Sequence, residues 1–172
     1  MSRTAPDPAA PKTVTLRPPT VNDGAALWQL REDVGKLDPN SPYAYLMVCD
    51  RFAKSSVVAE ADGRLVGFVC GIRSHEKPDT LFVWQVGVDP SLRGAGLARR
   101  MLADLASRDG GPRWLEATVT PSNEGSRALF RSFANSLGCA CEVRPCFLSD
   151  HFPGDTTEGE DLFRIGPLDS TT

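Results

Sequence analysis

The pattern of hydrophobic and polar positions predicts short strands that alternate with amphipathic helices. Period-two alternation or short apolar runs predict strands at residues 13–18, 55–60, 64–72, 80–88, 114–120, 139–148 and 161–168. Apolar residues at helical spacing predict helices at residues 22–35, 41–52, 98–108 and 122–137. We expect Asn22, Ser41 and Ser122 to cap three of these helices, and Gly35 to end the first.

The order of these elements, β-α-α-β-β-β-α-β-α-β-β, is typical of one sheet with helices packed against it. Asp62 and Gly63 separate two of the strands and predict a tight hairpin turn, since this dipeptide favours positive φ. The strand–helix–strand unit at residues 80–120 predicts a parallel crossover. The sequence therefore predicts an α/β (α+β) fold built on a mixed sheet.

The chain has the size of a single domain. Its 172 residues are 41% hydrophobic, enough for one substantial core. Residues 1–13 are rich in Pro and Ala and lack periodicity, so we expect a disordered N-terminal tail. The domain is expected to span residues 14–168, which leaves residues 169–172 as a C-terminal tail.

Charge and hydropathy exclude several classes of partner. The net charge is −3 and there is no block of Lys or Arg, so neither nucleic acid nor an anionic membrane is indicated. No apolar run approaches the roughly 18 residues of a membrane helix, and the N-terminus lacks the apolar segment of a secretory signal. We expect a cytoplasmic protein with a small-molecule partner.

The cysteines do not form a recognisable framework. They are odd in number, form no Cys-x-x-Cys pair and have no histidine at zinc-finger spacing. The five are Cys49, Cys70, Cys139, Cys141 and Cys146. We interpret them as reduced thiols and predict no metal site.

A glycine turn, RGAGLA, from Arg93 to Ala98 carries the most informative chemistry. Free backbone N–H groups at the start of a helix, approached through glycines, favour an anion such as phosphate. The simpler alternative is a loop whose glycines only supply turn dihedrals. A dinucleotide-binding turn fits less well, because Arg99 stands where its third glycine belongs. A Walker loop would need a Gly-Lys-Ser/Thr sequence, which is absent.

The same turn matches Q/R-x-x-G-x-G/A, the pyrophosphate turn of the GNAT N-acetyltransferases, and it follows a Val-x-Val strand end as in that family. The resemblance implies a GNAT-like, mostly antiparallel central sheet flanked by helices. In this family a bulge separates the strand from its neighbour, and its exposed backbone pairs with pantetheine. Acetyl-CoA is then the implied co-substrate. Its implied contacts are Gln85, Val86, Gly87, Val88, Arg93, Gly94, Ala95, Gly96, Leu97, Ala98, Asn123 and Ser126.

A second signature of this family, N-x-x-S/A-x-x-x-Y, is matched by Asn123 and Ser126 but ends in Phe130. In many members the tyrosine at this place protonates the departing CoA thiolate. Phenylalanine has no proton to donate, so another group must supply it here.

Four segments are similar to a narrower family, the L-2,4-diaminobutyrate acetyltransferases of ectoine biosynthesis and osmoprotection. They are LDPNSPYAYLMVCDRF, FVWQVGVDP, TVTPSNEGSRALF and the tail EGEDLFRIGPL. The resemblance implies acetyl transfer from acetyl-CoA to the γ-amino group of L-2,4-diaminobutyrate by a homodimer. A histidine that often precedes the acidic pair of the family's tail is replaced by Thr157, with His151 six residues upstream.

The implied acceptor carries one carboxylate and two ammonium groups, so its site needs carboxylates and a shaped wall. Asp38, Tyr43 and Tyr45 lie in the segment that covers the acceptor side in this family, and Trp84 lies beside the thioester. We interpret Asp38 as a partner of an ammonium group and Trp84 as a cation–π face. The alternatives are Asp38 as a turn former and Tyr45 and Trp84 as core aromatics.

The attacking amine must be neutral, whereas a free γ-ammonium group has a lysine-like pKa of about 10.4. Glu158 and Glu160 are the candidate bases, and backbone N–H groups at residues 86–88 are expected to polarise the thioester. A solvated acidic loop is the alternative for both glutamates. We expect direct transfer, since no Cys–His pairing indicates a covalent intermediate. Two other functions stay open: acetylation of another small amine or a protein N-terminus, and acyl-CoA binding without turnover.

Overall fold

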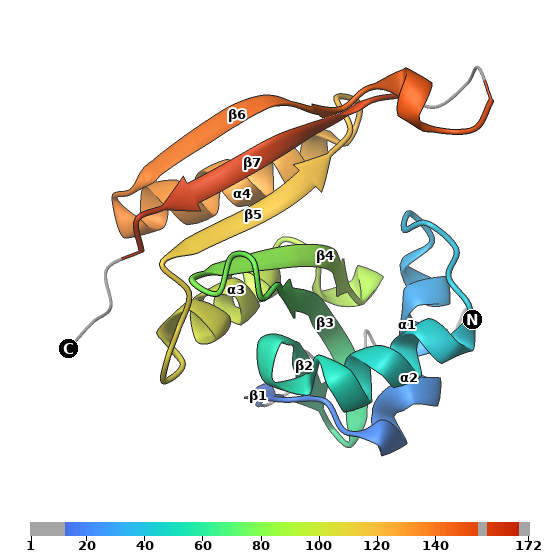
Figure 1. The fold of residues 1–172 in the computed structure, drawn as a ribbon. Helices are drawn as coiled ribbons and strands as arrows, with labels where there is room; N and C mark the ends of the chain where they lie inside the picture. The colour runs from blue at the N-terminus through green and yellow to red at the C-terminus, as the bar shows by residue number, and fades with distance from the viewer. Residues whose placement is uncertain (1–12, 155–157, 169–172) are drawn as a thin grey trace, which may run out of the picture.

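The computed structural model describes residues 13–154 and 158–168, which form one sheet with helices on both faces (Figure 1). The strands are β1 (Thr15–Arg17), β2 (Val57–Ala61), β3 (Arg64–Arg73), β4 (Thr80–Val88), β5 (Trp114–Val119), β6 (Ala140–Phe147) and β7 (Glu160–Gly166). The helices are α1 (Gly24–Val34), α2 (Pro42–Arg51), α3 (Leu97–Ser107) and α4 (Glu124–Leu137). The tails predicted at residues 1–13 and 169–172 lie outside the described residues, except for Thr13.

The strands are ordered β1-β2-β3-β4-β5-β7-β6 in a mixed, mostly antiparallel sheet. The pair β4 and β5 is parallel and is connected through α3, as the strand–helix–strand pattern predicts. All the other neighbouring strands are antiparallel. The final strand, β7, lies between β5 and β6, so the last segment of the fold is an interior strand.

Two hydrophobic cores hold the layers together. The larger lies between the sheet and α3 and α4, where Met101, Phe133 and Phe163 are fully buried. The smaller lies on the opposite face, where α1 and α2 pack Leu27 and other apolar residues against β3. Each large apolar side chain buried in this way stabilises the fold by about 1.5–3 kcal/mol. The helices α3 and α4 therefore cover one face of the sheet, and α1 and α2 cover the other.

Two helix caps differ from the prediction. Asn22 lies within a single 3₁₀ turn that precedes α1, and there the backbone N–H of Thr20 donates to Asp23 at 2.7 Å. At α4 the cap is Asn123 instead of Ser122, and its Oδ1 accepts from the Ser126 N–H at 3.1 Å. Before both α1 and α4, the sequence has more than one residue whose side chain can cap a helix. The choice among them depends on the exact start of the helix, which an apolar pattern does not give.

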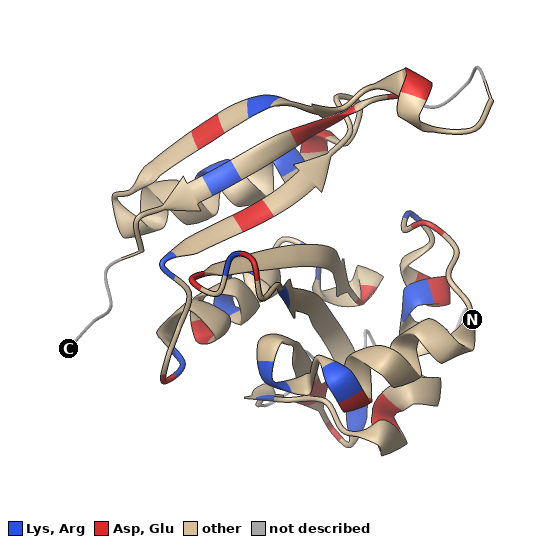
Figure 2. Ribbon diagram, viewed as in Figure 1, with Lys and Arg blue, Asp and Glu red and all other residues tan. Residues whose placement is uncertain are grey.

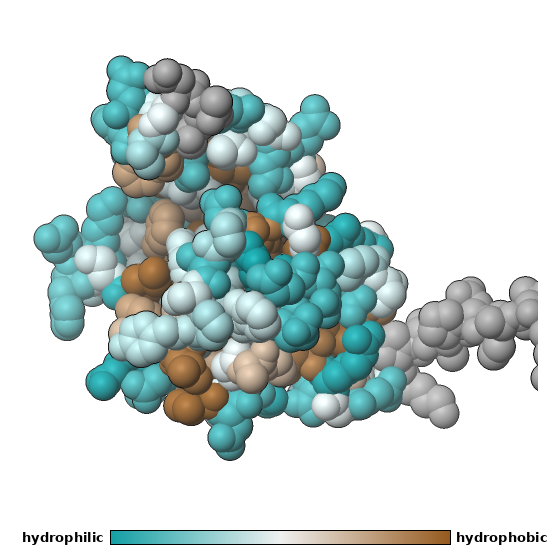
Figure 3. All heavy atoms as spheres, turned by 90° about the vertical axis from the view of Figure 1, so that its right-hand side faces the viewer, coloured by the Kyte–Doolittle hydropathy of each residue, from teal (hydrophilic) through white to brown (hydrophobic). Residues whose placement is uncertain are grey.

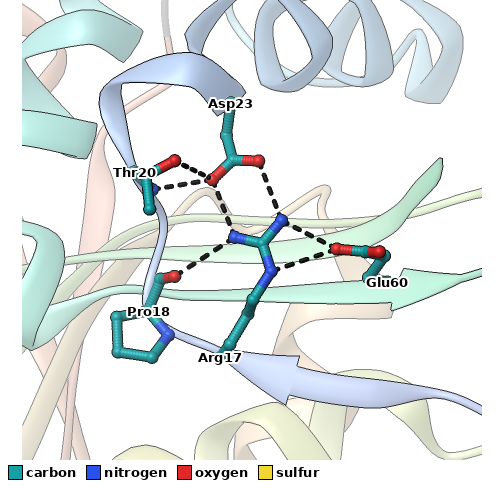
Figure 4. Close-up of polar contacts among 5 residues, drawn as sticks. All are labelled: Arg17, Pro18, Thr20, Asp23 and Glu60. Atoms are coloured by element: carbon teal, nitrogen blue, oxygen red, sulfur yellow. Dashed lines mark hydrogen bonds and ion pairs between the residues drawn. The ribbon is translucent and has the colours of Figure 1, made fainter. Parts of the chain in front are cut away.

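Arg17 of β1 ties the first strand to the segment before α1 and to β2 (Figure 4). Its guanidinium donates to both carboxylate oxygens of Asp23, at 2.8 and 2.9 Å. It also donates twice to one oxygen of Glu60, at 3.0 and 2.8 Å. The hydrogen bonds from Arg17 lower the pKa of Asp23 from 3.8 to about 2, against an opposing effect of burial.

Charged residues of both signs are spread along the described chain (Figure 2). Across the sheet, buried Glu116 of β5 pairs with Arg164 of β7 and with Lys77 at 3.4 Å. None of the helices in the described part of the chain is long and apolar enough to cross a membrane.

The Asp23 pair predicts a stability change in acid. Because the folded-state pKa lies below the unfolded value, ionised Asp23 stabilises the fold above about pH 4, and this contribution is lost as the pH falls toward 2. We expect the melting temperature of Asp23→Asn to lie below that of the wild type at pH 5–7, with a difference that shrinks between pH 4 and 2. Thermal unfolding followed by circular dichroism measures this difference. A difference that stays constant down to pH 2 would contradict the assignment.

Candidate active site

A two-part cleft opens where β4 and β5 separate. The two strands pair only from Thr80 to Phe82 on the β4 side, so the remainder of that edge of β4 has no described strand beside it. The large part of the cleft measures about 1000 Å³ and lies against the first turns of α3 and α4. The small part measures about 500 Å³ and lies toward the α1–α2 loop and β7. Both parts are lined by Lys36, Leu37, Thr120, Asn123 and Ser126.

The side from which β4 and β5 diverge is shown as a surface in Figure 3. Apolar patches interrupt a mostly hydrophilic surface there, several of them below the end of the β6–β7 hairpin. Phe147 and Phe152, near that end, line the small part of the cleft. Their rings lie 6.4 Å apart, edge to face. The small part therefore has an apolar wall as well as polar groups.

A bulge in β4 accompanies the separation of the strands. Cys70 of β3 lies opposite Gln85, but Gly71 lies opposite Val83, so Trp84 is an extra residue in β4. The bulge that the family resemblance implies for this strand is therefore confirmed.

The bulge also decides which side chains face the cleft. Trp84 packs against the smaller core, and the next residue, Gln85, reaches the same side to accept a hydrogen bond from the Tyr45 hydroxyl at 2.9 Å. Alternation resumes one residue out of phase, which brings Val86 and Val88 into the lining of the large part. The β4 segment thus contributes to both parts of the cleft.

The glycine turn lies at the mouth of the large part. Gly94 and Gly96 adopt φ of 79° and 76°, a conformation that other residues rarely adopt, and Gly96 is the N-cap of α3. The first-turn N–H groups of a helix have no acceptor within the helix and are free for an anion. The residues of this turn that line the cleft are Arg93, Gly94, Gly96, Leu97, Ala98 and Arg99.

Two predicted cofactor contacts do not line the cleft, and a third, Gln85, lines only its small part. Ala95 is not among the residues that line the cleft. Gly87 is buried against Phe68, and a Cβ at Gly87 would lie 2.5 Å from that ring. Gly87 therefore has a packing role, and only its backbone remains available for a ligand beside β4.

Helix α4 contributes the third wall. Asn123 and Ser126 line both parts of the cleft, although the Asn123 side chain is already engaged as the cap of α4. One turn further along, Phe130 is 3% exposed and borders the small part. Its ring lies 6.0 Å from that of Phe163, as expected for a core aromatic.

Three predicted residues from separate elements meet at the small part: Asp38 of the α1–α2 loop, Trp84 of β4 and Glu160 at the start of β7. They bring two carboxylates and an aromatic ring around one space. This combination can hold an ammonium group and accept a proton from it.

The loop that carries Asp38 is held by a buried guanidinium. Arg31 is 7% exposed, and it donates to the carbonyl of Asp38 at 3.1 Å and to that of Leu37 at 2.6 Å. Gln85 donates to the same Asp38 carbonyl at 3.5 Å. The backbone is bound inward while the Asp38 side chain stays exposed at the cleft.

The structure places the two predicted substrate tyrosines outside the lining of the cleft. Tyr45 is fully buried in the smaller core, and burial raises the pKa of its hydroxyl. Tyr43 is 67% exposed, since positions two apart on a helix lie about 200° apart around its axis. Neither tyrosine lines the cleft. Tyr45 is joined to the cleft lining by its hydrogen bond to Gln85.

The two candidate bases are also separated. Glu160 lines the small part, whereas Glu158 is exposed and accepts a hydrogen bond from the Ser122 N–H at 3.1 Å. Thr157 lies outside the described residues. His151 is exposed, and its Nδ1 accepts from the Leu148 N–H at 3.2 Å, so it is part of a local turn.

Sequence reasoning missed Arg31, Lys36, Phe147 and Phe152. Arg31 had a detectable signal, because it occupies the inner face of α1, four residues after Leu27, where an apolar residue is expected. The other three lie in loops or at a strand end, where periodicity carries no information about direction.

The cysteines do not contribute to the described lining of the cleft. Burial raises the pKa of Cys49 to about 11. No cluster of three or more metal-ligating side chains occurs in residues 13–154 and 158–168.

The fold and the cleft define an acetyltransferase: the sequence model of the acetyltransferase (GNAT) family matches residues 25–134, and the chain belongs to this family. Among solved structures, diaminobutyrate acetyltransferase EctA from Paenibacillus lautus, in complex with L-2,4-diaminobutyric acid and coenzyme A, is similar with a TM-score of 0.86. It is 41% identical and is matched over 93% of this chain and 98% of its own.

Curated relatives agree with this similarity. The L-2,4-diaminobutyric acid acetyltransferase of Halalkalibacterium halodurans is 51% identical over 96% of this chain and 88% of its own. That of Streptomyces coelicolor is 44% identical over 93% and 96%, respectively. The ribosomal-protein-S18-alanine N-acetyltransferase of Escherichia coli, at 18% identity and a TM-score of 0.66, shares the fold alone.

The glycine turn predicts a selective effect on acetyl-CoA. In Gly96→Val, a β-branched side chain at positive φ disturbs the turn, so we expect the KM for acetyl-CoA to rise by about tenfold or more. Gly63→Val is the matched control, because Gly63 also has a φ of 76° but lies in the β2–β3 hairpin. Steady-state kinetics and melting temperatures are measured for both variants. An unchanged KM in folded Gly96→Val would rule this turn out as the binding site.

Proposed function

We propose that the protein transfers the acetyl group of acetyl-CoA to the γ-amino group of L-2,4-diaminobutyrate. The observation that carries this proposal is the meeting of Asp38, Trp84 and Glu160 at the small part of a cleft whose large part bears the glycine turn. The similarity to diaminobutyrate acetyltransferases supports the same acceptor. A cytoplasmic location and a place in ectoine biosynthesis and osmoprotection belong to the same proposal.

Acetyl-CoA binds in the large part. The first turn of α3 and Arg99 bind the pyrophosphate, and pantetheine extends along the unpaired edge of β4 toward the junction with the small part. The thioester then lies next to the small part, with its carbonyl polarised by backbone N–H groups of residues 86–88.

Diaminobutyrate binds in the small part. Asp38 pairs with the α-ammonium group, and the apolar ring wall excludes water from the short chain. Glu160 accepts the proton of the γ-ammonium group, directly or through water, and the neutral amine attacks the thioester carbon. The C–S bond breaks and CoA leaves as the thiolate. Phe130 cannot protonate this thiolate, so its proton comes from another group or from water.

We propose direct transfer without an acyl-enzyme intermediate. The cleft wall carries no cysteine among the described residues, and the buried thiol of Cys49 holds its proton more strongly than a free thiol.

The proposal includes a homodimer. Strand β6 is an edge of the sheet, and Val143, Phe147 and Leu148 on or after it are 36%, 45% and 54% exposed. An open edge with apolar side chains favours coverage by another chain, and a second copy supplies it.

The acceptor assignment predicts a chain-length and regiochemical preference. We expect acetylation of L-2,4-diaminobutyrate on Nγ, because anchoring of the α-substituents brings only the terminal amine to the thioester. 2,3-Diaminopropionate is one methylene too short and ornithine one too long, so both should react about 10–200-fold more slowly in kcat/KM. Thiol release gives the rates, and NMR of the product gives the position. Acetylation on Nα, or equal rates for the three amines, would refute the proposal.

The assignment of Glu160 as the base predicts different kcat values for variants of Glu158 and Glu160, which lie two residues apart. We expect Glu160→Gln to lower kcat by about 10²–10⁴-fold, since the amine loses its proton acceptor, with little change in the KM for acetyl-CoA. Glu158→Gln is the matched control and should keep kcat within about threefold. Steady-state kinetics across pH 6–10 measure both. A larger loss in Glu158→Gln than in Glu160→Gln would reverse the assignment.

A further inference from the structure

The small part of the cleft contains a cation that the proposed reaction does not yet use. Among its described lining residues, the charged side chains are Lys36, Asp38 and Glu160. One cation and two carboxylates are the complement of an acceptor with one carboxylate and two ammonium groups. Lys36 lies at the junction of the two parts and lines both.

The backbone on both sides of Lys36 is fixed. Gly35, with a φ of 69°, ends α1 and turns the chain toward the cleft. The Arg93 guanidinium donates to the Val34 carbonyl at 2.9 Å, and Arg31 donates to the Leu37 carbonyl at 2.6 Å. Two side chains from different elements therefore hold the residues that flank Lys36.

The ammonium group of Lys36 is available for a ligand. Its side chain is exposed and has no hydrogen bond or ion pair with any residue that the structure describes. Asp38, two residues along the same segment, likewise has no ion pair with a described residue. The segment thus carries one positive and one negative side chain, Lys36 and Asp38, two residues apart on a backbone held by hydrogen bonds.

We infer that Lys36 binds the α-carboxylate of the acceptor and makes the enzyme selective for diamines that are α-amino acids. The inference rests on the proposed function, since it assigns a recognition residue for that acceptor. The α-carboxylate and α-ammonium groups share one carbon atom, which matches the short separation of Lys36 and Asp38 in the chain. With both held there, the γ-amine is the group that extends toward Glu160 and the thioester.

The competing role for Lys36 is an acetyl-CoA phosphate contact, because it also lines the large part. The large part already has two other cations, Arg93 and Arg99, and the free N–H groups of the α3 first turn. The small part has no other cation among its described residues. An acceptor carboxylate placed there would otherwise face two carboxylates without a counter-charge, which is unfavourable in a partly desolvated site.

The test compares L-2,4-diaminobutyrate with 1,3-diaminopropane, which is the same diamine without its carboxylate. Wild type, Lys36→Gln, Lys36→Arg and the control Lys54→Gln are assayed with both amines and acetyl-CoA. Lys54 is an exposed lysine that lines neither part of the cleft. We expect Lys36→Gln to lower kcat/KM for diaminobutyrate by about 10–100-fold, the effect of losing a charge-assisted hydrogen bond. The value for diaminopropane and the KM for acetyl-CoA should stay within about twofold. Lys36→Arg should restore most of the preference, and Lys54→Gln should match the wild type.

The outcomes separate this inference from the proposed function. If wild type fails to acetylate diaminobutyrate, the proposed function falls and this inference with it. If wild type is active but Lys36→Gln slows both amines equally, or raises the KM for acetyl-CoA while keeping the amine preference, the inference alone is overturned. Melting temperatures of all variants show whether a uniform loss comes from unfolding.

Discussion

The interrupted pairing of β4 and β5 is the constraint on which the site depends. Parallel hydrogen bonding joins the strands over three residues of β4, up to Phe82, and the extra residue Trp84 then bends β4 against β3. Continued pairing would satisfy the backbone edge of β4 and bring β5 to the usual strand spacing of about 4.8 Å, which leaves no room for a ligand. The separated strands leave that edge open, and buried backbone groups need a partner. A chain-like ligand that pairs as a strand supplies one.

Two guanidinium groups, of buried Arg31 and exposed Arg93, hold the loop side of the cleft. A buried cation is unfavourable unless its donors are paired, and Arg31 has acceptors on the Leu37 and Asp38 carbonyls and on Glu32. Arg93 binds the end of α1 from the glycine turn. Apart from the ion pair with Glu32, each of these pairings fixes a backbone carbonyl. Arg31 and Arg93 therefore fix the backbone of residues 34–38, and this backbone sets the positions from which Lys36 and Asp38 extend.

The predicted elements agree with the structure because each depends on local periodicity. The cofactor side was also predictable, since the motif at Arg93 to Ala98 is a continuous turn whose free N–H groups follow from its position before a helix. The acceptor side of the cleft was less predictable from the sequence. Tyr43 and Tyr45 lie in the correct segment, but their roles depend on the rotation of α2 about its axis, and only one of them can face the core. Glu158 and Glu160 are two residues apart and would share a face in a regular strand. Glu158, however, precedes β7 and accepts a hydrogen bond from the Ser122 N–H, and only Glu160 lines the cleft.

The sequence by itself determined the strands and helices, the parallel crossover, the glycine turn and the family resemblance, because all of these are encoded in short, contiguous patterns. The tertiary structure decided the insertion of β7 beside β5, the β4 bulge position and the selection of Asp38, Trp84 and Glu160 from the longer set of candidates. It also brought Arg31 onto the α1–α2 loop and Lys36 into the lining of the cleft. The reason is physical: these features depend on packing and hydrogen bonds between residues 6 to more than 100 positions apart, and no local pattern records which distant carbonyl or carboxylate a side chain will meet.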